Sequence, residues 1–196
     1  AVQTTLVGMD KPVIKKLLGT IRTTVPLGFK HHKTACSDKV MPHLETESLP
    51  IVSRELSSAR QQLGTLGGGN HFIEIQQDDE RWIWLMIHSG SRNLGHQVAT
   101  HYNRMAKEFG KKNSSQIPPG YQLDYLPLDS KQGKAYLQEM AYCVSFARHN
   151  RKAMMHTVQE LLVDLEPQAA FDDPIDIAHN YAAQETHFGK NVIVHR

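Results

Sequence analysis

The sequence predicts an α+β protein in which a mixed or antiparallel sheet is covered by helices. Two patterns carry this prediction. At residues 71–88, two runs of apolar, branched or aromatic residues flank a polar turn, as in a β-hairpin. On either side of it, apolar residues recur at helical spacing, at residues 11–24 and from 129 to about 165. With 196 residues, the chain is long enough to form one domain with its own core.

The first predicted helix covers residues 11–24, because Pro12 suits a helix start and Pro26 ends the apolar period. Residues 29–50 show no period and are predicted to be a long exposed loop. A short helix is expected at about 53–62, directly before a glycine-rich stretch.

After the hairpin, the sequence predicts a helix at residues 92–109 and a polar loop at 110–128. Residues 129–165 predict one long amphipathic helix or two abutting ones. Its expected core stripe comprises Tyr136, Leu137, Met140, Val144, Ala147, Met154, Val158, Leu161 and Leu162. The last residues, 192–196, read as a further strand.

The hairpin also makes a geometric prediction about two histidines. If its loop is even-numbered and centred between Asp79 and Glu80, His71 and His88 lie opposite each other, with Cβ atoms roughly 5 Å apart. Two imidazoles at that spacing can share a divalent cation, whereas hydrogen bonding to the backbone is the alternative that the pattern leaves open. Because apolar residues occupy both strand faces, the hairpin is expected to be buried on two sides.

Glycines in the stretch GTLGGGN, residues 64–70, allow the backbone to approach a ligand closely. On a regular strand, Asn70 and Glu74 face away from His71 and would contact something other than a metal. A carboxylate on an apolar strand needs a partner, so Glu74 either binds the N–H donors of a base such as guanine or pairs with an arginine.

The stretch HSGSRNLGH, residues 88–96, begins where a strand ends and a helix starts. Two hydroxyls, of Ser89 and Ser91, and the guanidinium of Arg92 lie beside free helix N–H groups, which is the pattern of a phosphate site. Ser91 acting as an ordinary N-cap explains the same pattern.

Composition sets the remaining expectations. The net charge of +2 is too small to predict nucleic-acid binding by itself, and twelve histidines are the one unusual signal. The two cysteines are far apart, and the sequence shows neither a signal peptide nor an apolar run long enough to cross a bilayer. These features predict a cytoplasmic protein without membrane association.

Three segments, GTLGGGNHFIE, MIHSGSRNLGH and AHNYAAQETHFG, together resemble the RtcB family of RNA-splicing ligases in their order and spacing. The stretches IRTTVPLGF and ARHNRKAMM are similar too, so that the likeness covers nearly the whole chain.

The resemblance implies a GTP- and Mn²⁺-dependent enzyme with an RtcB-like fold, active in tRNA splicing and RNA repair. Such a ligase joins an RNA 3′-phosphate or 2′,3′-cyclic phosphate end to a 5′-hydroxyl end through a protein–GMP intermediate on histidine. RNA, GTP and the accessory protein archease are the implied partners.

Carried over position by position, the resemblance implies three groups of site residues. The implied metal ligands are His71, His88 and His179. The implied nucleotide contacts are Asn70, Glu74 and Asn180, and the implied phosphate or RNA contacts are Ser89, Ser91 and Arg92.

The resemblance also implies that residues 1–196 are one central segment of such a ligase, truncated at both ends. The family's Asp and Cys metal ligands precede Ala1, and the histidine that carries GMP lies beyond Arg196. We therefore expect this chain alone to bind metal weakly and not to ligate RNA. Two alternatives remain, namely a metal-dependent phosphoesterase using the same histidines and a non-catalytic RNA-binding module.

Overall fold

The computed structural model describes residues 1–43, 49–112, 121 and 123–195. Its elements, in chain order, are β1 (Val2–Val7), α1 (Lys11–Thr24), a short 3₁₀ helix (Asp38–Val40), α2 (Pro50–Gln62), β2 (Phe72–Gln77), β3 (Trp82–His88), α3 (Arg92–Lys112), α4 (Lys131–Val163), β4 (Ala182–His187) and β5 (Lys190–His195). The predicted α+β class is confirmed. Parts of the loops predicted at 29–50 and 110–128 fall on residues 44–48, 113–120 and 122, which lie outside the described residues.

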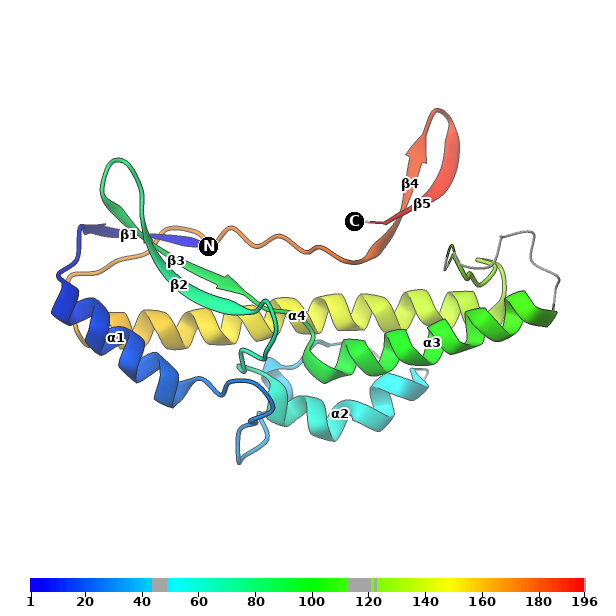
Figure 1. Cartoon of the computed structure of the whole chain (residues 1–196), viewed down its shortest axis with the longest axis horizontal. Coiled ribbons are helices and arrows are strands. Elements are labelled where there is room, and N and C mark those ends of the chain that lie inside the picture. The colour runs from blue at the N-terminus through cyan, green and yellow to red at the C-terminus, as the bar shows by residue number, and fades with distance from the viewer. Residues whose placement is uncertain (44–48, 113–120, 122, 196) are drawn as a thin grey trace.

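The main sheet has the strand order β1-β3-β2, with antiparallel pairing throughout. The sheet lies beside α1 and the second half of α4 (Figure 1). Ile83, Leu85 and Ile87 on its inner face pack against these helices. The opposite face holds the half-buried Trp82 and Trp84, so that the expected burial on two sides is wrong. Helices cover one face of this sheet.

The hairpin register differs by one residue from the prediction. The N–H of Asp78 donates to the carbonyl of Trp82, so that the chain reverses over three residues, 79–81, rather than over an even number. Arg81, the last of them, adopts a left-handed conformation with φ of 71°. A left-handed residue commonly closes three-residue hairpins, although glycine is its usual occupant. His88 therefore pairs with Phe72 instead of His71.

The same register decides the position of Glu74. Glu74 pairs with Met86, and Phe72 pairs with His88, so that Glu74 lies on the same strand face as His88. Glu74 is exposed and accepts a hydrogen bond of 2.8 Å from the Gln76 amide. Glu74 therefore shares a face with one of the implied metal ligands, whereas the expectation that it faces away from His71 stays a prediction, because His71 precedes β2.

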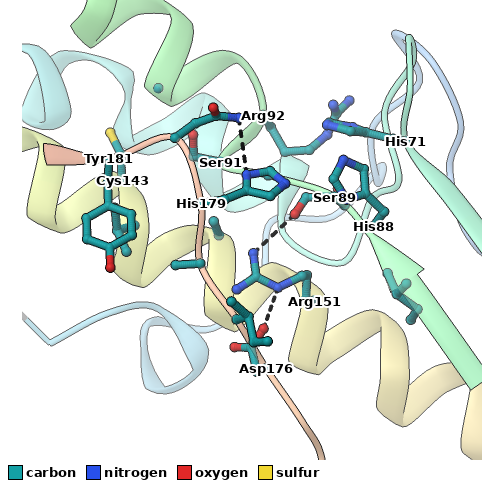
Figure 2. Close-up of a pocket in the computed structure, with 18 of the residues that line it drawn as sticks. His71, His88, Ser89, Ser91, Arg92, Cys143, Arg151, Asp176, His179 and Tyr181 are labelled. Carbon is teal, nitrogen blue, oxygen red and sulfur yellow. Dashed lines mark hydrogen bonds and ion pairs between the residues drawn. The ribbon is translucent and has the colours of Figure 1, made fainter. Parts of the chain in front are cut away.

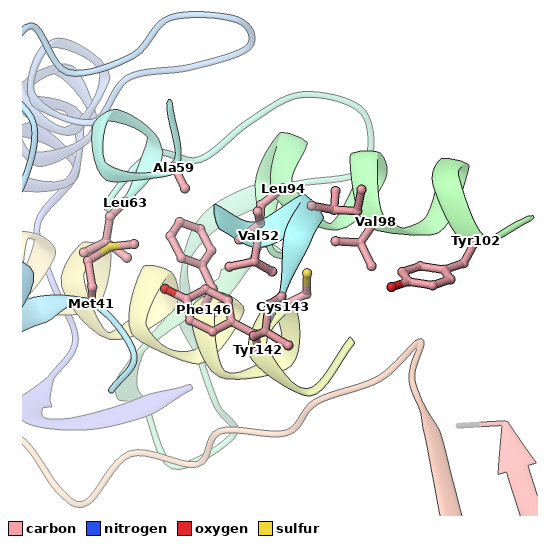
Figure 3. Packing of buried hydrophobic residues seen from close by; sticks show 12 residues of the cluster. Met41, Val52, Ala59, Leu63, Leu94, Val98, Tyr102, Tyr142, Cys143 and Phe146 are labelled. Atoms are coloured by element: carbon pink, nitrogen blue, oxygen red, sulfur yellow. The ribbon is translucent and has the colours of Figure 1, made fainter. Parts of the chain in front are cut away.

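Helix α4 is one continuous helix of 33 residues (Figure 1). It contributes residues to two hydrophobic clusters. Its first half packs Tyr142, Cys143 and Phe146 against α2 and α3 (Figure 3). Its second half supports the sheet through a buried set consisting of Met154, Val158 and Leu162. Ser130 caps the helix, and its hydroxyl accepts from the Gly133 N–H at 2.9 Å.

The predicted core stripe of α4 is correct in the second half and wrong in the first. Tyr136, Met140 and Val144 are only half-buried, because the face that carries them borders a cavity, although Tyr136 also packs against the first cluster. The buried face instead includes two polar residues, Glu139 and Asn150, each 0% exposed. Apolar residues occur on both faces of this half of the helix. Their spacing therefore does not indicate which face is buried in the core.

Glu139 holds the start of α2. Its carboxylate accepts hydrogen bonds from the N–H groups of Ile51 and Val52 at 3.1 and 3.0 Å, and from the Tyr102 hydroxyl at 3.3 Å. Leu49, at the N-cap position, supplies no side-chain cap of its own. A carboxylate from another helix thus satisfies the first free donors of α2.

Beyond α4, the chain runs back along the molecule as an extended segment, residues 172–181, which passes alongside α4 and leads to the β4–β5 hairpin (Figure 1). The strand expected near residue 192 is present as β5, paired antiparallel with β4. Within the described ranges, no helix is long and apolar enough to cross a membrane.

Candidate functional site

Three imidazoles from distant parts of the sequence converge in space. The ring centroids of His71 and His88 are 5.8 Å apart, and those of His88 and His179 are 5.1 Å apart. They come from the end of the glycine-rich stretch, the end of β3 and the extended segment after α4, respectively (Figure 2). The register shift does not separate His71 from His88, because His71 precedes β2 and is free of the strand's alternation.

These histidines line a cavity of about 570 Å³. Its walls are the end of β3, the start of α3, the middle of α4 and residues 175–182. Among the residues implied by sequence, the cavity brings together Asn70, His71, His88, Ser89, Ser91, Arg92, His179 and Asn180. Glu74 is not among the lining residues, although its strand leads to the cavity.

His71 is oriented by the glycine-rich stretch. Its Nδ1 lies 2.8 Å from the carbonyl of Leu66, to which it donates, leaving Nε2 as the free ring nitrogen. Partial burial lowers the pKa of His71 below its ordinary value, and the nearby Arg92 and His88 lower it further, against the opposing effect of the Leu66 bond. A neutral imidazole whose other nitrogen bonds a backbone carbonyl is the usual state of a metal ligand.

His88 is fixed by Phe72 of β2 and by Asn70, which precedes that strand. The Phe72 ring stacks on it at 5.3 Å, and the Asn70 amide nitrogen lies 3.4 Å from Nε2. Asn70 was implied to contact a nucleotide, and it is exposed beside this ring.

His179 lies on the extended segment. Asn180 has a left-handed backbone, with φ of 59°, and its amide lies 3.1 Å from the Nδ1 atom of His179. Asparagine tolerates this conformation better than most residues. The immediate effect of Asn180 is therefore on the orientation of His179.

Arg92 connects the start of α3 to the glycine-rich stretch. Its Nε donates to the Thr65 hydroxyl at 3.0 Å and its Nη2 to the Gly28 carbonyl at 2.9 Å. The backbone of Arg92 is left-handed, with φ of 58°, and these bonds help to hold a conformation that is unfavourable for a long side chain. Part of this guanidinium is thus already engaged within the protein.

The two serines differ in how they are placed. Ser91 is half-buried and lines the cavity. The Ser89 hydroxyl is buried and donates to the Leu66 carbonyl at 2.8 Å, so that its donor is already used. The role of Ser89 as a phosphate contact stays a prediction, and this bond counts against it.

The chemistry of the donors fits a divalent metal, but the histidines are not arranged as a finished site. Within the described ranges, no group of three His, Cys, Asp or Glu residues could hold an ion in this conformation. Amide nitrogens of Asn70 and Asn180 face His88 Nε2 and His179 Nδ1, so a cation bound to these two ring nitrogens would displace the amides. Burial raises the pKa of the Cys143 thiol, which also lines the cavity, to about 12 and keeps it protonated.

Comparison with known proteins decides the family. A family profile described as "tRNA-splicing ligase RtcB" matches residues 21–196. The chain belongs to the RtcB family. It is 36% identical over 157 residues to the tRNA-splicing ligase RtcB of Methanococcus maripaludis, covering 69% of this chain and 32% of that protein. It is 36% identical over 140 residues to the RNA-splicing ligase RtcB of Escherichia coli K12, covering 68% and 34%.

A third RtcB relative, the tRNA-splicing ligase of Archaeoglobus fulgidus, is 31% identical over 225 residues, which cover 90% of this chain and 46% of that protein. The chain therefore spans from about a third to nearly half of the length of these RtcB relatives. All nine site residues implied by sequence lie inside the region matched by the RtcB profile.

Three residues near the converging histidines were not predicted from the sequence. Asn150, Arg151 and Asp176 connect the segments that carry them. The sequence offered only a weak signal for the first two, a basic run on a helix, which reads as a solvated face.

Proposed function

We propose that this chain forms part of a GTP- and Mn²⁺-dependent RNA ligase, which joins RNA 3′-phosphate or 2′,3′-cyclic phosphate ends to 5′-hydroxyl ends through a protein–GMP intermediate. The observation that carries the proposal is the convergence of His71, His88 and His179, with ring centroids 5.8 and 5.1 Å apart, at one cavity of an RtcB-family chain.

The three imidazoles would hold the metal. Imidazole binds Mn²⁺, although its affinity for zinc or copper is higher. A divalent cation supplies positive charge that neutralises phosphate oxygens and orients them for displacement. The bond from His71 to the Leu66 carbonyl fixes the tautomer needed for ligation through Nε2.

The remaining polar groups of the cavity would hold the phosphates and the nucleotide. Arg92, Ser91 and the exposed Asn70 lie on the cavity wall next to the histidines. Glu74 projects from the same strand face as His88, two residues along β2 from Phe72, so a base stacked near Phe72 would meet this carboxylate. RNA is the proposed substrate, while archease as a partner and a cytoplasmic location stay predictions.

Manganese binding tests the metal assignment. We expect Mn²⁺ added to the 196-residue chain to broaden the imidazole NMR signals of His71, His88 and His179 selectively, with weak affinity because three imidazoles are a partial ligand set. His179→Ala should reduce the affinity at least tenfold by removing one ligand. His156→Ala is the matched control, because His156 is an exposed histidine on α4 that pairs with Glu160. Equal broadening in the His179→Ala variant would refute the assignment.

Guanylylation tests the place of this chain in the reaction. We expect no stable protein–GMP adduct after incubation with labelled GTP and Mn²⁺, because the resemblance implies that none of the histidines of this chain is the one that carries GMP. A labelled adduct surviving denaturing electrophoresis would show that a nucleophile is present here. Release of phosphate from a 3′-phosphorylated RNA, without a joined product, would instead favour the phosphoesterase alternative.

A further inference from the structure

We propose that Asn150 and Arg151, two consecutive residues of α4, set the spacing of the three histidines, and that Arg151 positions His179 through Asp176. The inference rests on the proposed function for its link to metal binding. Its geometric part stands on contacts within the chain. Asn150 and Arg151 are positioning residues, since they act on the histidines through other groups.

Asn150 joins the segments before His71 and after His88. Its side chain is 0% exposed. Its Oδ1 accepts from the N–H groups of Gly64 and Thr65 at 2.7 and 3.1 Å. Its Nδ2 donates to the carbonyls of Thr65 and Gly90, both at 3.1 Å, and lies 3.3 Å from the Ser89 hydroxyl. Only an amide side chain of this length both donates and accepts in this way.

The connection from Asn150 to the histidines is short. Leu66, next to Thr65, offers one carbonyl that accepts from both the His71 ring and the Ser89 hydroxyl. Ser89 directly follows His88 in the chain. Fixing the two loops on Asn150 therefore fixes the separation of His71 and His88.

Arg151 connects the segment of His88 to the segment that carries the third histidine, His179. Its Nη1 donates to the Ser89 carbonyl at 3.1 Å, and its Nε donates to Asp176 Oδ1 at 2.7 Å (Figure 2). Ser89 is one residue from His88, and Asp176 is three residues from His179. One guanidinium thus spans the two segments whose imidazole centroids are 5.1 Å apart.

The Arg151–Asp176 contact differs from an ordinary surface ion pair. The two side chains are only 15% and 25% exposed, so that solvent screens them incompletely. Arg148 also approaches Asp176, but at 3.6 Å and with a side chain 76% exposed. The rigid fork of Arg151 holds two acceptors at a fixed separation, which a lysine cannot do.

The decisive experiment compares Asp176→Asn with Asp173→Asn in the 196-residue chain. The control makes the same chemical change at an exposed aspartate three residues away on the same segment. Three quantities are measured: the NOE between the His88 and His179 rings without metal, the affinity for Co²⁺, which binds imidazole more strongly than Mn²⁺, and the urea midpoint.

We expect Asp176→Asn to abolish the ring NOE and to weaken Co²⁺ binding about 10–100-fold, the usual effect of losing an outer-shell partner, while its urea midpoint matches that of the control. Arg151→Lys should weaken Co²⁺ binding similarly, and it provides a second route if Asp176→Asn folds poorly. An NOE and a Co²⁺ affinity in Asp176→Asn equal to those of Asp173→Asn would overturn the proposal. If wild-type protein binds no Co²⁺ but Asp176→Asn still loses the NOE, the metal function fails and the positioning role stands.

Discussion

Replacing Glu139 with alanine is expected to lower the free energy of unfolding by about 3–5 kcal/mol. The carboxylate is fully buried and accepts from the N–H groups of Ile51 and Val52 and from the Tyr102 hydroxyl. Its removal leaves three donors without a partner in the core and deprives α2 of its cap. For a domain of ordinary stability, this loss is a large part of the total.

Urea denaturation followed by circular dichroism measures this effect. Gln138→Ala is the matched control, because Gln138 is the preceding residue of α4 and is exposed, and its change should stay within about 0.5 kcal/mol. Glu139→Gln should fall between the two, since the amide oxygen still accepts but the amide NH₂ meets a donor. If Glu139→Ala and Gln138→Ala unfold at the same urea concentration, the capping role of Glu139 is wrong.

Gly67→Ala is expected to be the most damaging substitution in the glycine-rich stretch. Gly67 has φ of 96°, and an added Cβ would collide with the Arg92 guanidinium and the His71 ring. Gly69 shares the left-handed backbone, with φ of 74°, but a Cβ there meets open space. The backbone penalty of about 1–2 kcal/mol is therefore common to both variants, and only Gly67→Ala adds the collision.

We expect Gly67→Ala to be destabilised by about 2 kcal/mol more than Gly69→Ala, as in an overpacked core. It should also weaken Mn²⁺ binding, because His71 must leave its bond to the Leu66 carbonyl. Thermal unfolding and Mn²⁺ titration of both variants measure these differences. If Gly67→Ala and Gly69→Ala have similar stability and similar Mn²⁺ affinity, the side chains of Arg92 and His71 move aside at little cost. The close packing around Gly67 is then not needed for metal binding.

Most elements of the fold could be predicted because each has a local cause, whereas the strands β1 (Val2–Val7) and β4 (Ala182–His187) were not predicted. The helix at 11–24 follows from periodicity and prolines, and the structure has α1 at Lys11–Thr24. The register of the hairpin could not be predicted, because it depends on the left-handed conformation of a single residue, Arg81. In the sequence DDER nothing marks that residue, since arginine is not a usual occupant of this conformation.

The candidate site was only partly visible in the sequence. Local pattern brought His71 and His88 together, but it gave no reason to place His179 with them, since that histidine is far away along the chain. Resemblance to the RtcB motifs supplied the third histidine. The role of Asn150, a buried residue with several hydrogen bonds, could not be predicted. A buried asparagine and a solvated one look alike in a sequence, and only tertiary contacts distinguish them.

The unbroken course of α4 has a consequence for how this protein loses function. Asn150 lies between Phe146 of one hydrophobic cluster and Met154 of the other, so that both clusters are built on the same helix. Local unfolding of either cluster would shift the middle of α4, where Asn150 lies. Thermal unfolding of either hydrophobic cluster should therefore disturb the position of Asn150 and with it the three histidines. We expect metal binding to be lost when the less stable of the two clusters unfolds.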